Sequence, residues 1–236
     1  MKSILIILML LYAGNLFSQI KQRSSGTSAY LGVGYKFVFL TNSAAQDAYP
    51  FFQLSNGDFL KEIDGMLGVS FNDKVAVEFS PAYLFTNASS GEGYYYKYQN
   101  TNFFYYPVYT NLFALPLNLR IKFFPFSNGT SDMLKKVYIG AGGGAMYIDE
   151  QITNQVYSEN SRINYLGTYT YKNDFWTPDY EILLGINSFS KIGFGFELSY
   201  RFVPLNQSRV NPIISSVADN FNSINFTANI IYSFDN

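Results

Sequence analysis

The sequence predicts an all-β protein, an eight-stranded antiparallel up-and-down transmembrane β-barrel, on three observations. Apolar residues alternate with small or polar residues along several segments at a period of two, which is the period of a β-strand. Short and long connections alternate along the chain, as they do in barrels that cross a membrane. Charged residues make up 14% of the 236 residues and aromatic residues 19%, a composition that is poorly suited to a water-facing surface.

Four segments show the alternation most clearly, and each places six apolar side chains on one face. In the last segment that face holds Ile224, Phe226, Ala228, Ile230, Tyr232 and Phe234. The other three rows run from Val75 to Phe85, from Phe113 to Phe123 and from Ile192 to Phe202. Weaker strands are expected over about 29–40, 59–71, 136–147 and 179–188, which brings the number of strands to eight.

The connections predict the topology. Residues 72–74 and 188–191 are expected to form tight turns, and residues 124–135 a link of middle length. The remaining connections are expected to be long loops over about 41–58, 87–110, 148–177 and 204–222. This alternation places every turn on one side of the membrane and every loop on the other, and an even strand number returns both chain ends to the turn side.

The apolar faces are expected to point toward lipid. The four clear rows hold 24 side chains, which would overfill an eight-stranded interior. The alternative is a soluble lipid-binding barrel, in which the apolar faces point inward and the Gly, Ser and Asn faces meet water with few charges. Rings near the strand ends are expected to form aromatic girdles: Tyr83, Phe85, Phe123, Tyr200, Phe202, Tyr232 and Phe234.

The first residues have the layout of a secretory signal peptide. Met1-Lys2-Ser3 supplies a positive start, and residues 4–12 form an unbroken apolar run. The apolar stretch is shorter than the roughly 20 residues of a membrane-spanning helix. We therefore expect residues 1–18 to be a signal peptide, 19–27 a polar N-terminal lead-in, and 28–236 a barrel domain in the cell outer membrane.

Composition excludes several functional classes. The 16 Lys and Arg residues against 17 Asp and Glu residues argue against binding to nucleic acid, which needs a basic surface. The chain has no Cys and no His, which excludes Cys-ligated metals and Ser-His or Cys-His hydrolases. The glycine-rich residues 140–145 are not a dinucleotide-binding turn, because Tyr147-Ile148 continues the strand where a helix would have to begin. We expect no catalytic residue, no cofactor and no metal site.

Three stretches resemble a known group of proteins. Leu115–Phe123 (LPLNLRIKF) has an early proline and inward basic residues, Val137–Gly144 (VYIGAGGG) is a glycine-rich strand, and Gly195–Phe202 (GFELSYRF) is a penultimate strand with an inward Glu and Arg. On these motifs the chain resembles the small outer-membrane β-barrels of the OmpX/OmpA-barrel type, and more closely the outer membrane protein β-barrel domain group that includes the PorT-like proteins.

The resemblance implies partners. It implies contact with outer-membrane lipid and with the outer-membrane assembly machinery, which reads a terminal aromatic residue. Here Phe234 is followed by Asp235-Asn236, so that signal is displaced by two residues. The PorT-like resemblance also implies an alternative, an accessory role in envelope secretion with a periplasmic partner. Lipid-modifying enzymes among such barrels use a histidine beside a serine, so the lack of histidine argues against catalysis.

The inward faces carry ionisable residues that the sequence predicts to be structural. They are Glu78, Arg120, Lys122, Glu181, Glu197 and Arg201. Buried charges must be paired, and strand direction predicts contacts between Glu78 and Arg120 and between Glu181 and Arg201. The functional alternative, a selective lumen or a proton path, is disfavoured because eight strands leave no aqueous channel.

The most unusual stretch is an aromatic-rich connection, which we expect to be a surface loop. Its nine aromatic residues are Tyr94, Tyr95, Tyr96, Tyr98, Phe103, Phe104, Tyr105, Tyr106 and Tyr109. Tyrosine-rich loops make adaptable binding surfaces, so these rings predict an extracellular glycan or protein ligand. Alternatively they extend the wall into the headgroup layer. The next long loop adds Tyr157, Tyr165, Tyr169, Tyr171, Phe175 and Trp176. The overall hypothesis is a non-enzymatic outer-membrane barrel with a structural or surface-binding role.

Overall fold

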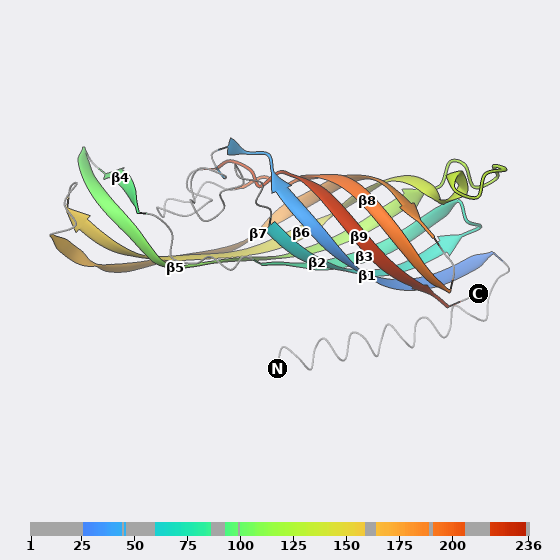
Figure 1. Cartoon of the computed structure of the whole chain (residues 1–236), viewed down its shortest axis with the longest axis horizontal. Coiled ribbons are helices and arrows are strands. Elements are labelled where there is room, and N and C mark those ends of the chain that lie inside the picture. Colours follow the sequence, from blue (N-terminus) through green and yellow to red (C-terminus); the bar gives the residue numbers. More distant parts are fainter. Residues whose placement is uncertain are drawn as a thin grey trace.

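The computed structural model describes residues 26–43, 45, 60–85, 93–98, 100–158, 164–188, 191–205 and 218–234. The expected signal peptide, most of the lead-in and Asp235-Asn236 lie outside the described residues. Within the described residues the chain forms one antiparallel sheet of nine strands in the order β3-β2-β1-β9-β8-β7-β6-β5-β4 (Figure 1).

The strand bounds are β1 (Thr27–Leu40), β2 (Leu60–Phe71), β3 (Val75–Phe85), β4 (Tyr94–Tyr98), β5 (Thr101–Phe123), β6 (Val137–Ser158), β7 (Tyr165–Asn187), β8 (Ile192–Phe202) and β9 (Ser223–Ser233). A short 3-10 turn, η3 (Leu134–Lys136), precedes β6. No described helix is long and apolar enough to span a membrane.

The sheet closes on itself through β3 and β5. These strands pair antiparallel from Val75–Phe123 to Phe85–Phe113, which joins the two ends of the sheet into a ring of eight strands. Strand β4 pairs only with the outer part of β5 and stands outside the ring. The predicted eight-stranded antiparallel up-and-down barrel is confirmed.

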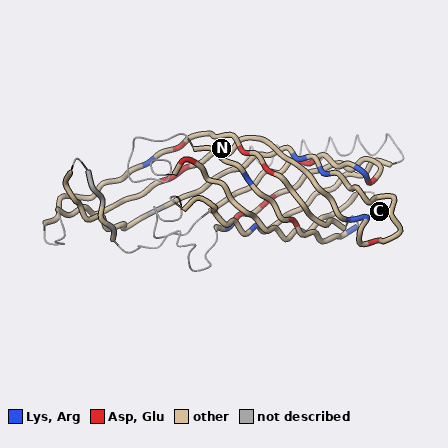
Figure 2. The backbone as a smooth tube through the Cα atoms, turned by 90° about the horizontal axis from the view of Figure 1, so that it is seen from above, with Lys and Arg blue, Asp and Glu red and all other residues tan. Residues whose placement is uncertain are grey.

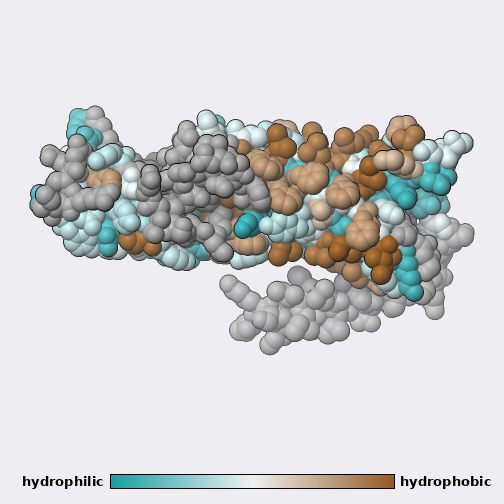
Figure 3. All heavy atoms as spheres, in the orientation of Figure 1, coloured by the Kyte–Doolittle hydropathy of each residue, from teal (hydrophilic) through white to brown (hydrophobic). Residues whose placement is uncertain are grey.

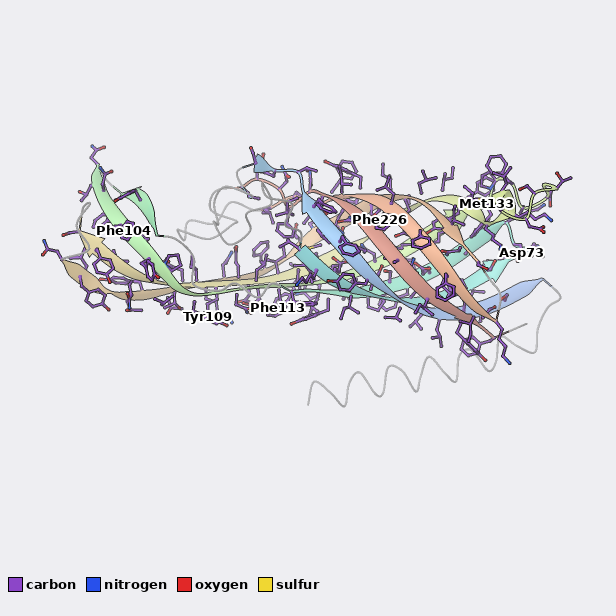
Figure 4. The ribbon with its side chains drawn as sticks, viewed as in Figure 1. Asp73, Phe104, Tyr109, Phe113, Met133 and Phe226 are labelled. Atoms are coloured by element: carbon purple, nitrogen blue, oxygen red, sulfur yellow. The ribbon has the colours of Figure 1, made fainter. Side chains whose placement is uncertain are left out.

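The turns, the start of β1 and the end of β9 meet at one end of the barrel. Asn72 and Asp73 connect β2 to β3 with positive φ angles of 50° and 54°, as the tightest hairpin turns require. At the same end the Ser28 and Ser233 hydroxyls lie 3.1 Å apart, so the first and last described strands start and finish together. Figure 4 shows Asp73 and Met133 at this end, which we call the turn end.

The outer wall of the barrel is apolar and its inner wall is polar. Phe194 is 63% exposed, Leu119 57% and Ile230 52%, while Asn225 and Thr227 on the opposite face are fully buried. Apolar residues cover the barrel half of the visible surface in Figure 3. A closed barrel with an apolar belt outside and charges inside is the construction of outer-membrane barrels. The chain is therefore an outer-membrane β-barrel that contacts lipid with its predicted apolar rows.

Two of the expected long loops are wrong. Connections 87–110 and 148–177 contain β4 and the outer parts of β5, β6 and β7, which are 23, 22 and 23 residues long. The outward row of apolar side chains stops at the membrane boundary, because beyond it the outer face meets water. The apolar–polar alternation that predicts strands therefore disappears there, although the hydrogen bonds between the strands continue. In Figures 1 and 2 this part projects beyond the barrel along its long axis.

Aromatic rings mark the outer rim of the belt. Tyr83, Phe113, Tyr147 and Trp176 form a row across β3, β5, β6 and β7, with ring centroids 6.1, 6.0 and 5.3 Å apart in turn. We call these four residues the rim row. Of the girdle residues predicted from sequence, six form adjacent pairs: Tyr83 with Phe85, Tyr200 with Phe202, and Tyr232 with Phe234. Tyr147 and Trp176, which the sequence analysis placed in a loop, complete the rim row.

The apolar belt yields a first prediction. Leu119→Arg places a charge on the outer face midway between Phe113 and Phe123 on β5, so we expect it to lower the free energy of unfolding by about 2–4 kcal/mol. Phe123→Arg, at the edge of the belt, should lower it by no more than about 1 kcal/mol. Urea unfolding in lipid vesicles measures both values. Equal losses for the two variants would contradict the placement of the belt.

Candidate functional site

The inside of the barrel holds ten charged side chains, each at most 2% exposed. The four cations are Lys36, Arg120, Lys122 and Arg201, and the six carboxylates are Glu62, Asp64, Glu78, Asp179, Glu181 and Glu197. All six of the charges predicted to point inward are in this group. The sequence analysis missed Lys36, Glu62, Asp64 and Asp179. The sequence does contain a signal for these four charges, because each lies at an inward-facing position of a predicted strand. The apolar alternation of those strands is weak, so their inward faces are hard to recognise.

Arg120 lies at the centre of the charge network. Its Nη1 is 3.1 Å from Asp64 Oδ2 and 3.3 Å from Glu78 Oε1. Its Nε and Nη2 donate to the two oxygens of Glu181 at 2.5 and 3.1 Å, which is the bidentate geometry that makes arginine–carboxylate pairs strong. The contact expected between Glu78 and Arg120 is present. One guanidinium thus links carboxylates from β2, β3 and β7.

The contact expected between Glu181 and Arg201 is replaced by others. The two residues are opposite each other in the β7–β8 register, but Glu181 binds Arg120, and Arg201 reaches Glu62 with bonds of 2.7 and 2.9 Å. Gly142 makes room for the contact between Arg120 and Glu181, because it lies between these residues in the sheet. A Cβ at Gly142 would lie 2.9 Å from atoms of both side chains, so a larger residue there would force them to shift.

Two buried tyrosines complete the network toward the turn end. The Tyr30 hydroxyl donates to Glu78 at 3.0 Å, and the Tyr138 hydroxyl donates to Glu197 at 2.6 Å. Lys122 lies between these carboxylates, with Nζ 2.8 Å from Glu78 and 3.5 Å from Glu197. The network is therefore held by neutral donors as well as by cations, which is what a buried set with more carboxylates than cations requires.

Apolar layers enclose the charge network at both ends. Toward the turn end lie Tyr30, Ala76, Phe124, Tyr138, Leu183 and Ile231. Toward the other end a larger cluster fills the lumen, including Leu40, Leu84, Leu112, Met146, Val203, Leu205 and Phe221. Charges sealed between apolar layers do not form an aqueous path, so the geometry favours a structural role for the predicted inward charges. The described residues hold no group of three ligands that could bind a metal ion.

Strand β4 and the outer parts of three ring strands form a sheet that projects beyond the rim row. This extension consists of β4 with residues 101–112 of β5, 148–158 of β6 and 165–175 of β7. From Tyr147 to Tyr157, ten residues of β6 continue past the rim row, which corresponds to roughly 30 Å of strand. Figure 4 shows Phe104 and Tyr109 on the extension and Phe113 closer to the barrel.

The predicted aromatic binding residues lie on this sheet rather than on a loop. Side chains of Tyr95, Phe104, Tyr157 and Tyr165 form a second row near its tip, with ring centroids 5.1, 6.4 and 5.6 Å apart. We call these four residues the tip row. Tyr95 is 61% exposed and Tyr165 55%, while Phe104 is 6% exposed. Phe104 thus serves as a small core that holds the outer rings in place.

The other predicted aromatic residues of this stretch differ in exposure. Tyr109 is 49% exposed, Tyr105 is buried, and Phe103 and Tyr106 are half-buried. The side chains of Tyr94, Tyr96 and Tyr98 lie outside the described parts of the structure.

Polar side chains occupy the outer face between the two aromatic rows. Thr153 and Thr170 pair across β6 and β7 with their hydroxyls 3.0 Å apart, and Lys172 lies 3.3 Å from Asp149. The hydrogen bond to Asp149 raises the pKa of Lys172, so this lysine keeps its charge at neutral pH. The outer face of the extension is thus a water-facing surface with exposed rings at its tip.

The Arg120 network yields a second prediction. Arg120→Met removes the cation that Asp64, Glu78 and Glu181 share, and it leaves the buried Glu181 without its ion-pair partner while Asp64 keeps Lys36 and Glu78 keeps Lys122. We therefore expect the free energy of unfolding to fall by about 3–5 kcal/mol. Arg120→Lys keeps the charge but not the fork and should be intermediate. Lys135→Met removes an exposed pair with Asp132 and should leave stability unchanged. Urea unfolding in lipid vesicles compares the three variants, and an Arg120→Met variant as stable as the parent would refute the central role of Arg120.

Comparison with known proteins adds only distant likenesses. No protein-family model and no curated protein sequence matches the chain. Among solved structures, the attachment invasion locus protein Ail of Yersinia pestis is 12% identical with a TM-score of 0.47, covering 89% of this chain and 100% of Ail. Neisserial surface protein A is 11% identical, with a TM-score of 0.41 and coverage of 88% and 97%. The N-terminal β-barrel domain of Pseudomonas aeruginosa OprF is 12% identical, with a TM-score of 0.36 and the same coverage. These TM-scores are all below 0.5, so the fold is assigned from the closed, hydrogen-bonded ring of strands in this chain and not from the likenesses.

Proposed function

We propose that the chain is a non-enzymatic outer-membrane barrel that binds an extracellular glycan or protein through the extension. One observation carries the proposal. Three adjacent strands of the ring, β5, β6 and β7, continue far past the rim row, where β5 pairs with β4, and the resulting sheet ends in exposed rings. A structure of that length beyond the membrane is explained by contact with something outside the cell.

The chemistry of the extension supports a binding surface. Tyr95 and Tyr165 offer flat apolar area together with hydroxyl groups, and Tyr165 already bonds to Thr168 at 2.6 Å. Rings that the sheet holds in fixed positions lose little conformational freedom when a ligand binds. The sealed lumen supports the same proposal, because an interior filled by ion pairs leaves the outer surface as the place where the protein acts.

The absence of catalysis is part of the proposal. The chain has no histidine and no cysteine, and its buried carboxylates are committed to ion pairs and tyrosine hydroxyls inside the barrel. Exposed residues of the extension supply hydroxyls and rings, which suit recognition more than bond cleavage.

The proposed binding surface gives a third prediction. The double variant Tyr95→Ala/Tyr165→Ala removes the two most exposed rings of the tip row, and we expect at least most of the binding to be lost. Outer-membrane vesicles that carry the protein are passed over immobilised glycans and immobilised extracellular matrix proteins, and retention is measured. The matched control is Asp73→Ala/Lys74→Ala, which changes exposed residues at the turn end and should retain full binding. Retention that survives the tyrosine changes would rule out the tip row, and loss in the control as well would show that the effect of the tyrosine changes is not specific.

A further inference from the structure

Large apolar side chains are exposed on the β5–β6 turn, residues 124–136, at the turn end of the barrel. Phe126 is 48% exposed, Leu134 49% and Met133 67%, and Met133 is the most exposed of the large apolar side chains that the structure describes. All three lie between the end of β5 and the start of β6, so they do not belong to an outward row of a strand. Figure 4 shows Met133 at the turn end. We call Phe126, Met133 and Leu134 the turn patch.

The β5–β6 turn lies next to the hydrocarbon layer. Phe113 of the rim row and Phe123 both lie on the outer face of β5, ten residues apart. Ten residues of a tilted strand span roughly 25 Å along the barrel axis, which is the height of the apolar belt in barrels of this kind. Phe123 therefore marks the edge of the belt at the turn end. Ile139 pairs with Phe123, so Lys136 lies roughly 8 Å past that edge along the axis, at the depth of the lipid headgroups.

Four lysines lie at the same end of the barrel as the turn patch. Lys135 and Lys136 are in η3, Lys74 is in the β2–β3 turn, and Lys191 directly precedes β8. Phe124 N donates to Lys74 O at 2.8 Å, so Lys74 lies beside the first residue of the β5–β6 turn. The three turns that carry these lysines join strands that follow one another around the ring, from β2 to β8. The four lysines therefore form an arc along one side of the turn end, which we call the basic arc.

The turns that carry the basic arc have a net positive charge. Residues 72–74, 124–136 and 188–191 together hold four lysines and two aspartates. Lys135 lies 3.1 Å from Asp132 in an exposed pair, and exposed pairs of this kind are weak. The other three lysines are exposed and form no ion pair with any residue that the structure describes. Their ammonium groups can therefore bind an anion from outside the chain.

We propose that the turn patch and the basic arc together bind an anionic phospholipid of the periplasmic leaflet. The lysine ammonium groups donate hydrogen bonds to the phosphate of the headgroup, and the turn patch packs against the glycerol and the upper part of the acyl chains. Short turns face the periplasm in outer-membrane barrels, which places the site in that leaflet. Segments that combine large apolar residues with lysines lie in the membrane interface, and lysines at the membrane surface attract anionic lipids. The site is separate from the extension and from the ligand proposed for it.

Continuity with the lipid-facing wall supports a lipid as the occupant. Phe123 is 47% exposed and Ile139 51% at the edge of the belt, and Phe126 follows Phe123 by only three residues. Lysine side chains beside such a surface lay their methylene stems along apolar groups and hold the ammonium at the headgroups. Lys135 fits this description, because its side chain is 40% exposed and it directly follows Leu134. A phosphate diester supplies the negative charge and the acceptor oxygens at that depth.

Lipid binding is tested with the full barrel refolded in detergent micelles. Phosphatidylglycerol and phosphatidylcholine with the same acyl chains are added in parallel, and native mass spectrometry measures how much of each lipid the folded protein retains. We expect phosphatidylglycerol to be retained in preference to phosphatidylcholine. Lys135→Gln/Lys136→Gln should weaken the binding of phosphatidylglycerol by about tenfold or more. Lys135→Arg/Lys136→Arg keeps both charges and should bind this lipid like the parent.

The matched control changes a lysine at the other edge of the belt. Lys172→Gln removes an exposed lysine of the extension, on the far side of the rim row, and should leave the binding of phosphatidylglycerol unchanged. Folding of each variant is checked by its unboiled electrophoretic mobility.

The depth of the β5–β6 turn is measured with one fluorescent label. Because the chain has no cysteine, Met133→Cys is labelled at a single site with a dye whose emission shifts to the blue in apolar surroundings. We expect a blue shift in vesicles made of equal parts of phosphatidylglycerol and phosphatidylcholine, and a smaller shift in vesicles of phosphatidylcholine alone. When Lys135→Gln/Lys136→Gln is combined with the labelled variant, the difference between the two kinds of vesicle should disappear.

Several results would overturn the proposal. They are equal retention of the two lipids by the parent, binding of phosphatidylglycerol by Lys135→Gln/Lys136→Gln that is as tight as in the parent, and an equal loss of binding in Lys172→Gln. A blue shift of the same size in both kinds of vesicle would show an apolar anchor that does not select anionic lipid. A dye that reports water in both would place the turn patch outside the membrane and leave a periplasmic protein as its occupant.

Discussion

The structure depends on one constraint, that every backbone N–H and C=O within the hydrocarbon must find a partner in the protein. The pairing of β3 with β5 meets this constraint by closing the sheet. Glu78 and Arg120 face each other across this seam and are joined there by an ion pair of 3.3 Å. Closure of the ring and assembly of the charge network therefore occur at the same place.

Closure also dictates what the interior can hold. Eight strands enclose little space, and small residues are needed where large side chains cross it. Gly142 lets Arg120 meet Glu181, and Gly68 and Gly185 stand opposite Tyr30 and Tyr138. These buried tyrosines in turn donate to the carboxylates of the network. The glycines of the barrel thus make room for the network that fills the lumen.

Sequence alternation predicted the membrane part of the fold because lipid outside and charge inside give each strand two distinct faces. It failed for the extension, where both faces of β6 and β7 carry polar side chains and the contrast is lost. The Glu78–Arg120 contact follows from direct pairing of neighbouring strands. The contact between Arg201 and Glu62 does not, because it joins residues 139 positions apart through side chains that cross the lumen.

The closing seam is tested most directly by a disulfide across it. Val77 and Ile121 are opposite each other on the outer face. Phe124 N donates to Lys74 O at 2.8 Å, so Lys74 and Phe124 form a hydrogen-bonded pair. Because the two kinds of pair alternate along an antiparallel ladder, Val77–Ile121 is a non-hydrogen-bonded pair with Cα atoms about 4.5 Å apart. Because the chain has no cysteine, Val77→Cys/Ile121→Cys introduces one defined pair within disulfide reach. On oxidation in the membrane we expect this variant to form an intramolecular disulfide, and Val77→Cys/Ile182→Cys, on strands that are not paired, to form none. Failure of the first pair to form a disulfide in folded protein would contradict the closed barrel.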